Sequence, residues 1–441
     1  MGILIMRNKN FICLILALGI IPSIAQATDV IKDSSIKIGG EVNSQFGIVN
    51  QQDAFRKNLK DPSQSYNKNS LANSGSLKFN YDKKSDSGLG YGAYIKLNAS
   101  TSDSPSGSKN IASEVKLYVE DKFGKIELGN TSPVGSAMEV NSYSLARATG
   151  GLDGDWNNWL KNGGVIDNSG TKEISGNYLM APQLPIGFDE TTKAGKINYF
   201  SPNVNGFTFG VSYTPDSKAK GTVSKNKDVL KNADGGYKNI WQPAVRYETT
   251  FENGAKFTTA VLGEFGKAKK VSYYDNIDAT TATTASTKEG DRKNLKAWQI
   301  GAGVDYKGFA FAGAYGDVGK SGVLELVDKD ENAKKGGKYW SLGSAYSTEK
   351  YGISINYMQS KRAGCLSKVK NTKDEDVHVK FVEEEYNKFE ALSIGADYLV
   401  MPGFMPYVEI TKFKFKENKN FGTSAKFNKG TVILAGTKIT F

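Results

Sequence analysis

The chain has 441 residues, and its 57 Lys and Arg against 46 Asp and Glu give a formal net charge of +11. Two cysteines and one histidine exclude a disulfide-stapled small domain and a zinc site, which needs several nitrogen or sulfur ligands, and we expect no cofactor. Glycine (48 residues), Tyr and Phe (22 each) are abundant while Pro is scarce (11), which favours an all-β chain with many turns.

The first 27 residues have the three parts of a secretory signal peptide. Arg7 and Lys9 form a basic start, the apolar run FICLILALGIIPSI follows, and a small-x-small cleavage sequence, AQA, ends at Ala27. We therefore expect residues 1–27 to be removed and residues 28–441 to form the mature protein. Beyond residue 27 no run of about 18 apolar residues remains, so the sequence predicts no membrane-spanning helix.

The segment SIKIGGEVNSQFGIV (35–49) alternates apolar and polar side chains. Its apolar positions are Ile36, Ile38, Val42, Phe46 and Ile48, and its polar positions are Lys37, Glu41, Asn43 and Gln45. This period of two predicts a β-strand with one apolar and one polar face. Three later segments repeat the pattern and place Lys78, Lys96 and Lys116 on their polar faces.

The connections between the alternating segments are short and long in turn. The short ones carry Gly, Asn or Asp and read as tight hairpins at 82–88, 120–124, 201–206, 251–254, 306–308, 347–352 and 399–403. The long polar ones run at about 50–70, 100–110, 130–192, 215–238, 267–293, 318–336, 361–386 and 416–428. The count is about sixteen strands, with short turns at one end and long loops at the other. This pattern predicts a 16-stranded antiparallel transmembrane β-barrel of the outer membrane, with short periplasmic turns and long extracellular loops.

A soluble β-sandwich, or several, is the rival fold. It has no need of loops that are long on one side only, and several domains would be joined by linkers. The alternation continues without a linker from residue 35 to 441. A closed barrel also leaves no strand edge exposed to lipid, which favours it over the sandwich.

The last segment, TVILAGTKITF, places Ile433, Ala435, Thr437, Ile439 and Phe441 on one face. We expect this strand to pair with the strand near 35–49 and close the cylinder. A final strand with an outward apolar face that ends on Phe resembles the assembly signal of Gram-negative outer-membrane barrels. Ile439 and Phe441 are therefore predicted to serve barrel closure and assembly.

Several stretches together resemble the general porins of Gram-negative bacteria, most closely the alphaproteobacterial kind. They are IKIGGEVNSQFG near the start, EVKLYVEDKFGKIELGNTSP (114–133), KINYFSPNVNGFTFGVSYTPD (196–216) and the terminal GTKITF. The resemblance implies a homotrimer in the cell outer membrane that lets ions and small hydrophilic solutes diffuse passively. Outer-membrane lipid and lipopolysaccharide are further expected partners. Nucleic acid is not, because the protein is exported and its lysines are scattered along the sequence.

Porins of this kind fold their third long loop into the barrel to form a constriction, which by position is 130–192 here. Its two tryptophans, in GGLDGDWNNWL, favour packing over disorder. The pore-facing acids predicted from it are Glu139, Asp153, Asp155 and Asp167, and the basic partners predicted on the wall are Lys37, Lys78, Lys96 and Lys116. The early strands lack the arginine cluster common in the family. The positive balance favours a mild anion preference.

Two other functions are known for outer-membrane barrels: catalysis and surface adhesion. An outer-membrane protease or phospholipase needs an activated nucleophile or water, usually with histidine as base, and His378 stands in a run of charges without an obvious Ser or Asp constellation. We therefore predict no enzymatic activity. A surface antigen or adhesin without significant pore activity is the alternative that stays open, because several loops are long and polar.

Overall fold

The computed structural model describes residues 34–56, 63–98, 111–148, 150–160, 174–175, 191–221, 235–274, 287–325, 334–363, 367–370, 376–379, 386–416 and 427–441. The signal peptide predicted at 1–27 and the acid Asp167 lie outside these residues.

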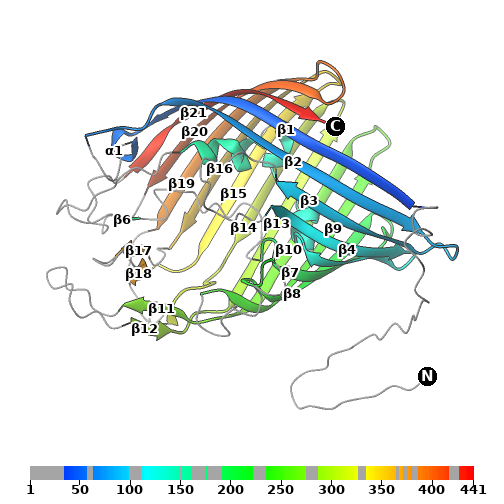
Figure 1. The fold of residues 1–441 in the computed structure, drawn as a ribbon, viewed down its shortest axis with the longest axis horizontal. Helices are drawn as coiled ribbons and strands as arrows, with labels where there is room; N and C mark the ends of the chain where they lie inside the picture. The colour runs from blue at the N-terminus through cyan, green and yellow to red at the C-terminus, as the bar shows by residue number, and fades with distance from the viewer. Residues whose placement is uncertain are drawn as a thin grey trace, which may run out of the picture.

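Sixteen antiparallel strands form one closed barrel, as the sequence predicts (Figure 1). In chain order they are β1 Ser34–Gln51, β2 Asn69–Lys84, β3 Gly90–Asn98, β4 Ala112–Asp121, β5 Gly124–Asn130, β7 Gly195–Phe200, β8 Phe207–Asp216, β9 Tyr237–Thr250, β10 Lys256–Ala268, β13 Leu295–Tyr306, β14 Phe309–Asp317, β15 Gly337–Ser347, β16 Tyr351–Arg362, β19 Asn387–Tyr398, β20 Phe404–Lys416 and β21 Phe427–Thr440. Each strand pairs with its neighbour in sequence, so the barrel is a simple up-and-down meander.

The first and last barrel strands close the cylinder. β1 pairs with β21 in register from Glu41 opposite Thr440 to Gln51 opposite Gly430. Beyond this ladder the Phe441 amide donates to the Gly40 carbonyl at 3.1 Å, and the Gly40 amide donates to the Phe441 carbonyl at 2.8 Å. The expected pairing of the terminal strand with residues near 35–49 is therefore confirmed.

The two ends of the barrel differ as predicted. Seven short hairpins join strands at one end, which we call the turn end, and β1 begins and β21 ends there too. The eight long connections lie at the other end, the loop end. All seven predicted hairpins and all eight predicted long connections fall between the strands where the sequence placed them.

The outer face of the barrel is apolar. One register row on five neighbouring strands consists of Ile355, Ile394, Ile410, Ile433 and Ile48. All five side chains are exposed on the isolated chain. Such a surface is stable against lipid, and none of the residues that the structure describes forms a second layer over it. The apolar face predicted for residues 35–49 is this outer face.

Short elements outside the barrel wall were not predicted. A second sheet combines three long connections at the loop end (Figure 1). Its five short strands are, in sheet order, β12 Thr287–Gly290, β11 Val271–Tyr274, β18 Asp376–Val379, β17 Ser367–Lys370 and β6 Ile174–Ser175. The helices are α1 Asp53–Arg56, α2 Val134–Met138 and three 3-10 turns, η1 Tyr143–Leu145, η2 Gly151–Asp153 and η3 Asp155–Trp159. In the described part of the chain, none of these is a long apolar helix of the kind that crosses a bilayer.

Candidate functional site: the lumen and its inserted loop

The inner face of the barrel is polar. Side chains that alternate with the lipid-facing ones include amides and hydroxyls on nearly every strand. Examples are Asn43, Gln45, Asn198, Ser212, Gln242, Gln299, Ser341, Asn356, Ser393 and Thr411. An interior of this composition is stable in contact with water and not with lipid.

The third long connection enters this interior. After β5, α2 packs against β7 to β10, η1 against β14 to β16, η2 against β16, β19 and β20, and η3 against β21. Figure 1 shows these short helices inside the barrel. The described part of the loop predicted at 130–192 thus lies along the inner wall from β7 around to β21.

Wall glycines allow the loop backbone to come close. A Cβ at Gly47 would lie 2.6 Å from the Trp159 ring, and one at Gly210 would lie 2.7 Å from the Met138 Sδ. A Cβ at Gly301 would overlap the Val140 carbonyl oxygen. These three glycines sit on β1, β8 and β13, so the loop is fitted to the wall at several points around the barrel.

An apolar cluster holds the second half of the loop. Trp156 is fully buried, and its ring centroid lies 5.6 Å from Phe413 and 6.3 Å from Phe389. The Trp156 Nε1 donates to the Leu152 carbonyl at 2.9 Å. Trp159 is buried in the same cluster. The two tryptophans are packed, as the sequence predicts.

Polar contacts fix the loop along its course. The Ser212 Oγ accepts from the Val134 amide at 2.8 Å, which satisfies the start of α2. At the turn end, Arg147 forms an ion pair with Asp397 and donates from Nη1 to the Thr348 carbonyl at 3.2 Å. Because Thr348 belongs to a short hairpin, the loop reaches deep into the barrel before it rises again to Trp156.

The wall formed by β2 to β5 carries a network of charges. Lys116 lies 3.0 Å from Glu127 and 3.5 Å from Glu114, and the Lys193 Nζ donates to Glu114 at 2.9 Å. Lys125 also contacts Glu127, at 3.3 Å. These strands therefore present paired charges of both signs to the lumen.

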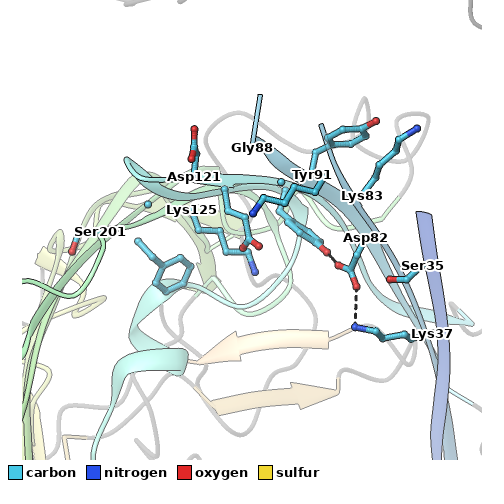
Figure 2. Close-up of a pocket in the computed structure, with 15 residues that line it drawn as sticks. Ser35, Lys37, Asp82, Lys83, Gly88, Tyr91, Asp121, Lys125 and Ser201 are labelled. Carbon is cyan, nitrogen blue, oxygen red and sulfur yellow. Dashed lines mark hydrogen bonds and ion pairs between the residues drawn. The ribbon is translucent and has the colours of Figure 1, made fainter. Parts of the chain in front are cut away.

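At the turn end this wall opens into a wide pocket (Figure 2). Lys37 and Asp82 form an ion pair there at 3.6 Å, and the Tyr118 hydroxyl donates to the same carboxylate. The Lys37 side chain is 72% exposed. Lys37 thus lies at the mouth of the barrel.

The other predicted lysines lie on the inner wall. Lys78 and Lys96 are direct cross-strand partners on β2 and β3, and Lys96 is opposite Glu114 on β4. Lys116 belongs to the ion-paired network. The described ion pairs of Lys37 and Lys116 are formed with the wall carboxylates Asp82, Glu114 and Glu127.

The three described loop acids have different surroundings. Glu139 is half-buried and accepts a hydrogen bond from the Tyr143 hydroxyl at 2.5 Å. Asp155 is half-buried and accepts from the Asn43 Nδ2 on β1 at 3.1 Å. Asp153 is exposed to the lumen on one side, while the enclosing barrel removes part of its hydration and raises its pKa to about 6.

Sequence reasoning missed Glu114, Glu127, Lys193, Arg147 and Asp397. The parity of β4 placed Glu114 on the same face as Lys116, but its further partners, Thr131 and Lys193, come from the two ends of the long loop. Arg147 and Asp397 are 250 positions apart. Only the strand register and the path of the loop bring such residues together.

A family model described as Gram-negative porin matches residues 14–418. The chain belongs to the Gram-negative porin family. It is an outer-membrane protein that crosses the bilayer with its sixteen strands. An uncharacterized protein of Rickettsia bellii is 26% identical to this porin, and the match covers 93% of each chain. An uncharacterized protein of Rickettsia conorii is also 26% identical, and the match covers 74% of this chain and 75% of the relative.

Solved structures share the fold. An anion-selective porin from Comamonas acidovorans has a TM-score of 0.52 at 13% identity, covering 93% of this chain and all of that one. In-vitro folded OmpT, an outer membrane protein of Vibrio cholerae, has a TM-score of 0.54 at 10% identity, covering 92% of this chain and 98% of that one.

Proposed function

We propose that this porin forms a water-filled channel for passive diffusion of ions and small hydrophilic solutes, with a mild preference for anions. The observation that carries the proposal is the path of the inserted loop. It lies along the wall from β7 to β21. The opposite wall, β2 to β5, keeps its charged side chains facing the lumen, and the pore passes between the two.

The balance of charge differs between the two sides of this passage. The wall offers Lys78, Lys96 and Lys116 beside the carboxylates Glu114 and Glu127, and the loop offers Glu139, Asp153 and Asp155. An excess of base on one side and acid on the other sets a transverse field that orients polar solutes and disfavours apolar ones. Because lysine is a mobile point charge, the preference for anions is expected to be weak. The anion-selective porin among the structural neighbours supports the same sign.

Planar-bilayer recordings of the refolded mature protein in a salt gradient test this function. We expect stepwise, ohmic conductance and a reversal potential on the anion side. A double variant, Lys78→Gln with Lys96→Gln, is expected to shift the reversal potential toward cation preference. Lys122→Gln with Lys350→Gln, which removes the same charge from exposed positions in the short turns, is the matched control. A folded protein without conductance would contradict the channel function, and a wild-type potential on the cation side would contradict the anion preference.

We also propose that the protein assembles as a homotrimer. The strands β5 and β7 are the shortest of the barrel, and the outer face of β4, β5 and β7 carries exposed Val115, Leu117, Leu128 and Ile197. A trimer form exists for the structurally similar Vibrio cholerae OmpT. A low, apolar section of wall suits contact between barrels better than contact with the full thickness of lipid. Leu117→Arg with Leu128→Arg is expected to yield folded monomers by native mass spectrometry, whereas trimers of this variant would contradict the interface.

A surface antigen or adhesin is the second candidate function. The observation in its favour is the five-stranded sheet that joins three long connections at the loop end, because an ordered surface is better suited to a specific partner than separate loops are. A folded barrel with no conductance would favour this function over the channel. Deletion of 275–286 from the wild-type protein, with binding to host-cell surfaces as the readout, tests it directly.

A further inference from the structure

Strand β3 has no side chain on its inner face at the turn end. Gly90 and Gly92 hold the two inward positions there, in register between β2 and β4. A Cβ at Gly90 would lie 3.0 Å from the Glu120 Cγ, and one at Gly92 would lie 2.5 Å from the Tyr118 hydroxyl oxygen. Side chains of β4 therefore lean over β3. We call the space above Gly90, between β2 and β4, the turn-end recess.

One charge of each sign faces this recess. Lys84 on β2 and Glu120 on β4 share a register row, with Gly90 between them. Two strand spacings, roughly 9.6 Å, separate their Cα atoms. Both side chains are exposed, and neither forms an ion pair or a hydrogen bond with any residue that the structure describes. Deeper on the same wall, in contrast, Lys116 and Glu127 are paired at 3.0 Å. The recess thus offers charges that are available to a solute.

The pocket around the recess repeats both signs of charge (Figure 2). Lys37 lies 3.6 Å from Asp82. Lys125 points into the same space, and its Nζ lies 4.5 Å from the centre of the Tyr118 ring. The pocket has a volume of about 960 Å³, which is ample for a small solute and its water. A solute with a single charge would meet like charge as well as opposite charge there, whereas a solute with both charges can satisfy both.

We propose that the turn-end recess binds free α-amino acids, in their zwitterionic form, as they pass through the pore. The solute carboxylate contacts Lys84, its ammonium group contacts Glu120, and its side chain stays in the open lumen. Two side chains of opposite charge that reach toward each other from Cα atoms roughly 9.6 Å apart leave a gap that one small zwitterion can bridge.

Binding at the recess is compatible with passage through a channel. Contacts between exposed charges are weak, so the solute is held briefly and then released, as conduction requires. The glycine floor leaves room for the solute backbone beside the wall. This inference rests on the proposed diffusion function and names a class of solute that the pore favours.

The test measures solute binding to the refolded mature protein in neutral detergent by saturation-transfer NMR. Three matched probes are used at neutral pH: L-alanine, propionate, which lacks the amino group, and ethylammonium, which lacks the carboxylate. Wild-type protein should bind alanine about fivefold more tightly than either of the other two. Propionate that binds as tightly as alanine would indicate a simple anion site and overturn the proposal.

Variants of the recess locate the binding. Lys84→Gln and Glu120→Gln should each weaken alanine binding about three- to fivefold. Gly90→Leu fills the recess without changing any charge and should weaken alanine binding at least as much. The control Glu349→Gln with Lys350→Gln removes one charge of each sign from exposed positions in the hairpin between β15 and β16, and it should bind alanine as wild type does.

Equal alanine binding by Gly90→Leu and wild type would overturn the proposal, as would equal losses in the recess variants and the control, which would indicate a general charge effect. Heat-modifiable migration on gels shows whether each variant folds. If Gly90→Leu does not fold, Glu120→Gln decides the question, because its side chain is exposed. Conductance of the same preparations separates this site from the channel. A protein that conducts but does not prefer alanine would refute only the recess, and one that binds alanine but does not conduct would refute only the diffusion function.

Discussion

Trp156 is the side chain whose removal should most disturb the inserted loop. It is fully buried between the loop and the inner faces of β19 and β20, where its ring lies against Phe389 and Phe413. A buried tryptophan covers about 200 Å², which at about 25 cal/mol per Å² corresponds to roughly 5 kcal/mol. Measured Trp→Ala changes in cores cost about 3–5 kcal/mol. We therefore expect Trp156→Ala to weaken loop docking by about 3–5 kcal/mol while the barrel stays closed.

Two assays follow this change in the refolded protein. Loop docking is read from the noise of the open-channel current, which should rise as the loop leaves the wall. Global stability is read from urea titrations scored by heat-modifiable migration. Trp298→Ala is the matched control, because Trp298 faces lipid and does not touch the loop cluster. A variant with unchanged noise and a loss of less than about 1 kcal/mol would show that the cluster does not hold the loop.

Three more predictions concern the lumen and the closing strand. With a pKa of about 6, Asp153 is ionised at pH 7.5 and mostly protonated at pH 5. Acidification should therefore increase the preference for anions. The variant Asp153→Asn should remove the part of the change in reversal potential that this carboxylate causes. Gly301→Val should displace the loop, because the new valine side chain would overlap the Val140 carbonyl. The single-channel conductance should then differ from the wild-type value. Identical conductance would contradict the close contact. Phe441→Ala removes an outward ring that is 62% exposed but keeps the backbone pairing with Gly40. We therefore expect slower folding into lipid vesicles with little change in final stability. Equal folding rates of variant and wild type would exclude an assembly role for the ring.

Much of the fold could be predicted because the strands and hairpins of a β-barrel are determined by short local sequence patterns. The alternation in 35–49 gives the strand, and Ile36, Ile38, Val42, Phe46 and Ile48 are the outward side chains in the structure. Hairpins carry Gly, Asn or Asp at positions where the backbone needs a positive φ, as at Asn205 and Gly206. Because this need concerns only a few adjacent residues, a hairpin can be predicted from a short stretch of sequence. The second sheet could not be predicted in this way, because its strands are only two to four residues long and pair between different loops.

The site was predictable only in part, because it depends on the loop path. Parity placed Lys78, Lys96 and Lys116 on the inner wall, and this is where they lie. It could not distinguish Lys37, which has the same parity but stands at the turn-end mouth, since height in the barrel depends on how far each strand is shifted against its neighbours. The partner of Arg147 was out of reach for the same reason: Asp397 comes from the turn end of a strand near the close of the barrel.

The pattern of charges on the outer wall depends on the same geometry. In the sequence Lys338, Lys361, Lys388 and Lys416 are spread over 78 positions and read as scattered solvated charges. In the barrel, antiparallel register places them in one row across four neighbouring strands. A charge pattern on a barrel is therefore two-dimensional, and a linear charge profile cannot display it.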